Sequence, residues 1–148
     1  MASATAFPDY RGDMRYACLG CGNRYGIDEL LYTCPACGEV LLLEDLSFDS
    51  LKRRSGEEWR ALFDARAADK TLALRGIFRF YELMAPVVEE EDIVYLGEGN
   101  TPVIEAAPAL QRAVGARFAF KNDGQNPSAS FKDRGMACAF SYLKALVR

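Results

Sequence analysis

The residues of this sequence with the clearest chemical potential are a lysine in a polar loop and four cysteines in two close pairs. Lys132 lies in the run from 126 to 135, just after a proline-bearing loop. Ser130 and Asp133 match an S-x-x-D capping box, which predicts Ser130 as the N-cap and Lys132 as the second helical residue. The positive end of the helix dipole disfavours a charged amine there, which favours a free lone pair that attacks an aldehyde carbon. The alternative is a solvated surface lysine beside a good N-cap.

The four cysteines form two Cys-x2-Cys pairs, and 12 residues separate the pairs. Their spacing is typical of a tetrahedral Zn²⁺ site with four thiolates at about 2.3 Å. The predicted ligands are Cys18, Cys21, Cys34 and Cys37. Because four thiolates leave no open coordination position, the zinc would be structural. Two disulfides, or a site that has lost its metal, are the alternatives.

Two further observations narrow the chemistry. The chain has no histidine, which excludes Ser-His catalysis, Cys-His catalysis and histidine-ligated metals within it. A fifth cysteine, Cys138, falls inside the predicted Lys132 helix and is interpreted as a small core residue rather than a nucleophile.

Several predicted elements surround these residues. A second capping box at Ser55 and Glu58 predicts a helix that runs to about Ala68, with Trp59, Leu62 and Phe63 on its buried face. Helices are also predicted over residues 76–84, with Pro86 as the stop, and over 108–114, with Gly115 after the last residue. Short strands are predicted over residues 41–43, 93–96 and 117–121. After Lys132, an apolar face is predicted from Met136, Phe140, Leu143 and Val147.

Length and composition bound the class of protein. The chain has 148 residues, half of them hydrophobic, and a net charge of −3 from 18 basic and 21 acidic residues. This composition is that of a soluble globular protein, and it gives no sign of a polyanion-binding surface. No apolar run approaches the roughly 20 residues of a membrane span, and the N-terminus does not resemble a signal peptide. We therefore expect cytoplasmic residence and, since cytosolic thiols stay reduced, no disulfides.

Three motifs in order carry a resemblance to a known family. The Lys132 run resembles the cofactor-lysine motif of fold-type II enzymes that use pyridoxal 5′-phosphate (PLP), most closely that of the threonine synthase family. Residues 96–102 are similar to that family's G-E-G-N-T-P loop. Residues 77–83 resemble its W-R-Y-x-E-L helix, with Ile77-Phe78 where a Val-Trp pair is usual. Some members of the family also resemble this chain in carrying a four-cysteine ribbon ahead of the PLP domain.

The resemblance implies an α/β fold: a zinc ribbon followed by the beginning of a fold-type II (tryptophan synthase β-like) domain. It divides the chain into a flexible N-terminus (1–15), the ribbon (16–43) and part of the catalytic domain (44–148). Lys132 is then the catalytic residue and PLP anchor, and Phe131 packs against the cofactor, although Phe131 as a plain core aromatic is an equal alternative. Ser128-Ala129 departs from the usual Thr-Gly, and losing that glycine restricts the approach of the backbone to the cofactor.

The activity that the resemblance implies is PLP-dependent conversion of O-phospho-L-homoserine and water to L-threonine and phosphate, a carbon–oxygen lyase reaction. The Gly-rich loop for the PLP phosphate is not found in the sequence, so we expect the N-terminal part of a larger homo-oligomeric enzyme, inactive as 148 residues alone. A related PLP enzyme such as cysteate synthase is the alternative with the same chemistry.

A non-enzymatic zinc-ribbon adaptor, including one that binds nucleic acid, is the alternative from another class. Between Tyr16 and Leu46 the only basic residue is Arg24, against five acidic ones. A phosphate-contacting face needs the opposite charge. We therefore expect a small amino-acid substrate as the partner, and neither nucleic acid nor membrane.

Overall fold

The computed structural model describes residues 6–69, 74–84 and 86–148. Residues 1–5, part of the predicted flexible N-terminus, lie outside the described residues. Within residues 6–15, the Phe7 ring packs edge-on against Tyr81, with ring centroids 4.8 Å apart. The Tyr10 hydroxyl donates a 2.5 Å hydrogen bond to Asp45. The predicted domain boundaries stay a prediction.

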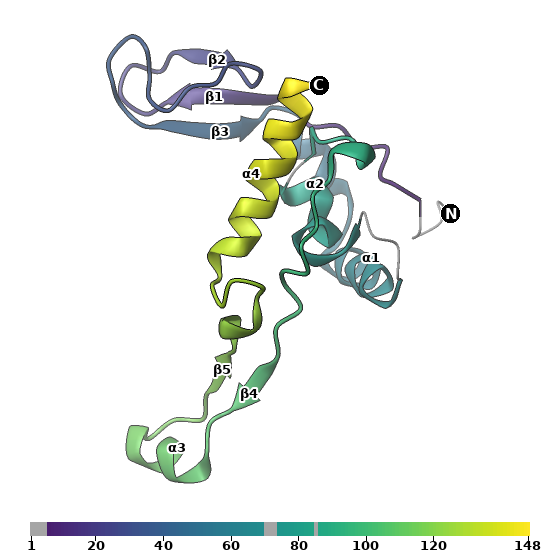
Figure 1. Ribbon diagram of the computed structural model, residues 1–148, viewed down its shortest axis with the longest axis vertical. Helices are drawn as coiled ribbons and strands as arrows, with labels where there is room; N and C mark the ends of the chain where they lie inside the picture. The colour runs from purple at the N-terminus through teal and green to yellow at the C-terminus, as the bar shows by residue number, and fades with distance from the viewer. Residues whose placement is uncertain (1–5, 70–73, 85) are drawn as a thin grey trace.

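The N-terminal part of the chain forms a three-stranded antiparallel sheet with the order β2-β1-β3 (Figure 1). The strands are β1 (Met14–Cys18), β2 (Arg24–Gly26) and β3 (Leu41–Asp45). Tyr16 of β1 lies between Tyr25 of β2 and Leu43 of β3. The strand predicted over residues 41–43 is confirmed and continues to Asp45. Because the sheet is small, it has little apolar core of its own.

Helix α1 (Gly56–Ala68) follows the short 3-10 helix η1 (Phe48–Arg53). Its predicted capping box is confirmed, since Ser55 Oγ accepts from the Glu58 N–H at 3.2 Å and the Glu58 carboxylate accepts from the Ser55 N–H at 2.7 Å. Trp59, Leu62 and Phe63 are half-buried. The one fully buried residue of α1 is a cation, Arg66.

Arg66 forms a buried ion pair with Glu82. Two hydrogen bonds of 2.7 Å join the guanidinium to the carboxylate, and Arg66 also donates to the Arg79 carbonyl at 2.9 Å. The pair connects α1 to the helix predicted over residues 76–84, which is confirmed as the 3-10 helix η3 (Gly76–Phe80) continued by α2 (Tyr81–Met84). A buried charge is tolerated here because two charge-assisted hydrogen bonds join the guanidinium to the carboxylate.

The apolar core lies where η3 meets the C-terminal helix α4 (Lys132–Val147). Phe78, Val88 and Ala137 form its buried centre, and Ile77, Ile93, Cys138 and Tyr142 pack around them. The short 3-10 helix η4 (Glu90–Asp92) also contacts α4.

The middle of the chain departs from one prediction. Residues 93–96 do not form a strand, because the Val94 N–H donates to the buried Ser141 hydroxyl of α4 at 2.8 Å instead of to a neighbouring strand. The second sheet consists of β4 (Val103–Glu105), which the sequence did not predict, and β5 (Ala119–Lys121), inside the predicted strand 117–121. The two strands are antiparallel, and α3 (Pro108–Val114) connects them, ending at Gly115 as predicted.

Helix α4 runs from the β4–β5 sheet to the three-stranded sheet (Figure 1). It packs through small residues, Ala137 and Ser141, which are fully buried. The predicted apolar face lies elsewhere on the helix and is exposed: Met136, Phe140, Leu143 and Val147. Small residues let α4 approach η3 and η4 closely, which leaves the larger apolar side chains pointing outward.

A cavity of about 200 Å³ lies between the middle of α4 and the three-stranded sheet. Met14, Tyr16 and Leu43 line it from the sheet, and Cys138 and Tyr142 line it from the helix. Burial raises the pKa of the Cys138 thiol to about 11, as expected of a small packed residue rather than a nucleophile. Within the described ranges, no helix combines the length and apolar character needed to cross a membrane.

Candidate functional site

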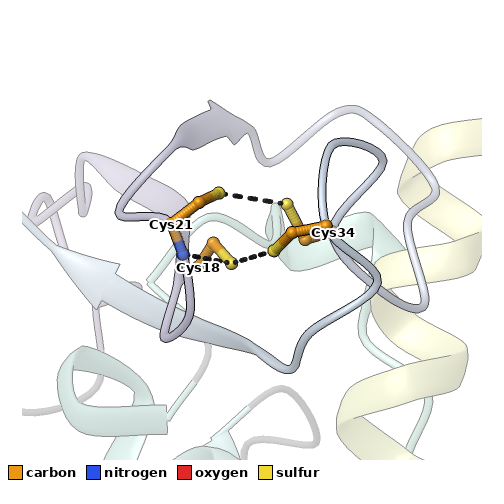
Figure 2. Close-up of side chains that lie close together, drawn as sticks. Cys18, Cys21 and Cys34 are labelled. Carbon is orange, nitrogen blue, oxygen red and sulfur yellow. Dashed lines mark hydrogen bonds between the residues drawn. The ribbon is translucent and has the colours of Figure 1, made fainter.

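The four predicted cysteine ligands come together in the sheet domain. Cys18 ends β1, Cys21 lies in the turn after it, and Cys34 and Cys37 lie in the loop before β3. All four Sγ atoms lie within 4.8 Å of one another. The Cys18–Cys37 and Cys21–Cys34 sulfurs are 3.4 and 3.6 Å apart. Figure 2 shows the side chains of Cys18, Cys21 and Cys34 converging from the two loops.

Backbone N–H groups surround these sulfurs, as a thiolate cluster requires. Cys18 Sγ accepts from the Gly20 and Cys21 N–H groups at 3.3 and 3.4 Å. Cys34 Sγ is also contacted at 3.1 Å by the Tyr25 hydroxyl from β2. This hydrogen bond lowers the pKa of the Cys34 thiol to about 6.

The donor set fits a tetrahedral ion. Four thiolates around Zn²⁺ at about 2.3 Å place neighbouring sulfurs roughly 3.8 Å apart, close to the separations found here. Two separate disulfides would not require all four sulfurs to converge, and the five cysteines, including Cys138, are free. The cluster is therefore compatible with zinc.

Lys132 begins α4, but the predicted capping box is wrong. The N-cap position is Phe131, which makes no side-chain capping bond. The Asp133 carboxylate accepts instead from the Ser128 N–H at 2.8 Å and from the Ser128 hydroxyl at 2.5 Å, so it cannot reach back to Ser130. Ser130 Oγ accepts a 3.2 Å bond from the Lys132 N–H. The loop before the helix is thus closed by the Ser128–Asp133 contact, together with the single bond that Ser130 Oγ accepts.

The Lys132 and Phe131 side chains are both exposed, and Phe131 retains 64 % of its accessible area. Two residues earlier, Ala129 has a φ of 57°, a left-handed conformation that favours glycine. The family motif that the Lys132 run resembles has glycine at this position. Alanine in its place is strained, because its Cβ disfavours the left-handed conformation.

A polar network fixes the start of α4. Arg134 binds both oxygens of Asp123, at 2.7 and 2.8 Å, and donates to the Thr101 hydroxyl at 3.0 Å. That hydroxyl in turn donates to Asp123 at 2.8 Å. The Arg134 guanidinium, with Thr101, lowers the pKa of the Asp123 carboxyl to about 2. The carboxylate is therefore ionised at neutral pH and holds the first turn of α4 against the loop before β4.

Two glycines let the three motif segments meet. The N–H of Gly99 donates to the side chain of the buried Asn126 at 2.9 Å. A Cβ on Gly99 would lie 3.2 Å from the Gly76 Cα, and a Cβ on Gly76 would lie 2.7 Å from the Glu98 carbonyl. Both glycines have positive φ, 84° and 56°. Residues 76–83, 97–102 and 126–135, far apart in sequence, thus form one continuous unit around the start of α4.

Sequence reasoning missed the residues that position this unit. They are Thr101, Asp123, Asn126 and Arg134. In the cysteine cluster, sequence reasoning also missed Tyr25, which contacts Cys34. Thr101, Asn126 and Arg134 lie inside the motifs quoted above. Their polar side chains beside an apolar helix could have indicated a hydrogen-bonded network there. Asp123 carried no signal, because its partner Arg134 is 11 residues away.

The fold and the two sites define a mixed α/β protein in which a four-cysteine cluster on a three-stranded antiparallel sheet precedes a loop-and-helix unit carrying a lysine. The chain is homologous to the N-terminal regions of threonine synthases. It is 34 % identical over 124 residues to threonine synthase of Methanocaldococcus jannaschii, which covers 83 % of this chain. It is 46 % identical over 72 residues, 47 % of the chain, to threonine synthase of Synechocystis sp.. It is 31 % identical over 129 residues, 82 % of the chain, to chloroplastic threonine synthase 2 of Arabidopsis thaliana.

These matches span only part of each relative. They cover 27 % of the M. jannaschii protein, 19 % of the Synechocystis protein and 24 % of the Arabidopsis protein. No protein-family model matches the chain. The homology therefore covers most of this chain but only about a quarter or less of each relative.

Proposed function

We propose that this chain is the N-terminal region of a PLP-dependent threonine synthase, which converts O-phospho-L-homoserine and water to L-threonine and phosphate. The observation that carries the proposal is the convergence of the three motif segments around the start of α4, in a chain homologous to threonine synthases. Asn126 and Arg134 connect residues 126–135 directly to residues 97–102, and Gly76 of the third segment lies against Gly99.

Lys132 is the proposed attachment point of PLP. Its side chain is exposed, and among the described residues none pairs with its amine, so Nζ is free to bind an aldehyde. When bound, PLP supplies an electron sink for the negative charge that develops at substrate carbons. Lys132 Nζ would take and return the protons at those carbons, and the exposed Phe131 ring would lie against one face of the cofactor.

The helix start keeps Lys132 in place during this chemistry. Residues two apart on a helix point in very different directions, about 200° apart around its axis. Arg134 therefore binds Asp123 on the inner side while the Lys132 side chain stays exposed. In a protein of the relatives' length, we expect further residues to cover the exposed apolar face of α4 and to supply the site for the PLP phosphate.

The cysteine cluster is proposed to hold one structural Zn²⁺ through Cys18, Cys21, Cys34 and Cys37. The metal would fold the three-stranded sheet, whose core is too small to be stable alone. Because four thiolates leave no open coordination position, this metal would be structural rather than catalytic.

The test of the PLP proposal is borohydride trapping in the longest natural protein that contains this sequence. We expect reduction in the presence of PLP to leave a pyridoxyl group on the peptide that contains Lys132, and Lys132→Ala to remove it. Lys144→Ala, also on α4, is the matched control and should keep the adduct. A protein that binds zinc and folds but gives no adduct would instead be a zinc-ribbon adaptor.

Substrate identity needs its own assay. Phosphate release from O-phosphohomoserine supports threonine synthase, whereas sulfite-dependent release from O-phosphoserine supports cysteate synthase. We expect the 148-residue chain alone to be inactive in both assays and the whole enzyme to be a cytoplasmic homo-oligomer.

A further inference from the structure

One side chain outside the four cysteines contacts the cluster with its hydroxyl group. Tyr25 lies in β2, and its Oη is 3.1 Å from Cys34 Sγ. The Asn23 side-chain N–H₂ donates to the same Oη at 3.5 Å. Because an amide N–H₂ can only donate, the single proton of the Tyr25 hydroxyl is left for the sulfur. The direction of the bond is therefore from Tyr25 to Cys34.

Burial makes this donor hard to replace. Cys34 retains only 2 % of its accessible area, whereas Cys21 and Cys37 are exposed to water. A water molecule can therefore hydrogen-bond the exposed sulfurs, but it has little access to the Cys34 sulfur. If the Tyr25 hydroxyl is removed, the backbone donors that remain for that sulfur are the N–H groups of Ala36 and Cys37.

The charge of the cluster explains why the donor matters. Four thiolates and one Zn²⁺ carry a net charge of −2, which needs neighbouring hydrogen-bond donors when the site is partly buried. Donors outside the ligand set commonly change metal affinity by about 10- to 100-fold when they are removed. We propose that Tyr25 is a positioning residue of the zinc site, whose hydroxyl holds the Cys34 thiolate in place and retains the metal. This inference rests on the proposed zinc site.

The variant that tests it is Tyr25→Phe, which removes the hydroxyl and keeps the ring that lies opposite Tyr16 in the sheet. Tyr32→Phe is the matched control, because Tyr32 belongs to the same domain but is 88 % exposed. Zinc affinity of the full chain is measured by competition with a chromophoric chelator. We expect Tyr25→Phe to bind zinc about 10-fold more weakly and Tyr32→Phe to bind it as the unchanged chain does.

A Co²⁺-loaded sample gives a readout that a loss of folding would not produce. With the hydrogen bond gone, the sulfur electrons are held less tightly, so the sulfur-to-cobalt charge-transfer band should move to longer wavelength. The tetrahedral four-thiolate spectrum itself should remain, and far-ultraviolet circular dichroism of the zinc-loaded variant should match that of the unchanged chain.

The outcomes separate the two proposals. If the unchanged chain binds one zinc ion and Tyr25→Phe binds it equally tightly with an unmoved cobalt band, the role of Tyr25 is overturned and the zinc site stands. If the unchanged chain binds no stoichiometric zinc and gives no four-thiolate cobalt spectrum, both proposals are wrong.

Discussion

Replacing Ala129 by glycine should stabilise the protein, although glycine usually destabilises. Ala129 has a φ of 57° and an exposed side chain, so the substitution removes strain and loses no packing. An L-residue in the left-handed region costs roughly 1–2 kcal/mol, whereas the extra freedom of glycine in the unfolded chain costs about 0.4–1 kcal/mol. The difference favours Ala129→Gly by about 0.5–1 kcal/mol, or about 1–4 °C in Tm for a chain of this size.

Urea unfolding of the zinc-loaded chain measures this difference directly. The matched control is Ala61→Gly, at an exposed position inside α1, where glycine should lower the free energy of unfolding by about 1 kcal/mol. The two alanine-to-glycine changes should therefore have opposite signs. If Ala129→Gly is neutral or destabilising while Ala61→Gly behaves as expected, the loop before Lys132 does not hold Ala129 in the left-handed region.

Two further predictions concern charged pairs. Arg66→Met leaves the Glu82 carboxylate buried without its cation and should lower the free energy of unfolding by about 3–5 kcal/mol. Arg66→Met/Glu82→Leu should lower it by less, because no unpaired charge stays buried. Urea unfolding in which the double variant is less stable than the single variant would contradict this. The Arg134 guanidinium lowers the pKa of the Asp123 carboxyl to about 2 in the folded chain, below the usual value near 3.9. The stabilising contribution of this carboxylate is therefore complete at pH values above about 3.9 and is lost as the pH falls through 2. The stability advantage of the unchanged chain over Asp123→Asn should therefore be constant above about pH 5 and shrink between about pH 4 and pH 2, and a constant difference across that range would refute the assignment.

Local signals in the sequence were reliable where both partners lie within a few residues. The Ser55–Glu58 capping box, the Pro108 start and Gly115 end of α3, and the spacing of the four cysteines all predicted what the structure shows. The prediction over residues 93–96 was wrong because the hydrogen-bonding partner of Val94 is Ser141, 47 residues later. The helix begins one residue later than predicted, and the Asp133 half of the Ser130 capping box is absent because Ser128 donates to the Asp133 carboxylate, although Ser130 Oγ still accepts from the Lys132 N–H.

The prediction for the reactive lysine depended on a different kind of information. Residue types around Lys132 left its role open, and only the resemblance to a family of known chemistry singled it out. The structure adds how such a lysine is positioned, although the roles of Lys132 and Phe131 stay predictions. The polar groups that fix the helix come from the loop before β4 and the loop after β5, so no single sequence window contains them.

If Lys132 is the PLP attachment point proposed above, the arrangement around α4 separates anchoring from reactivity within one helical turn. Arg134 is held by a carboxylate and a hydroxyl, and Asn126 ties the preceding loop to Gly99. Lys132, two residues before Arg134, is left exposed. A residue that must bind an aldehyde and then move protons needs a free amine on a rigid support, and the two requirements conflict if the amine itself forms the anchoring contacts. Assigning the anchoring contacts to Arg134 resolves that conflict, because the helix start stays fixed while the Lys132 side chain remains available for chemistry.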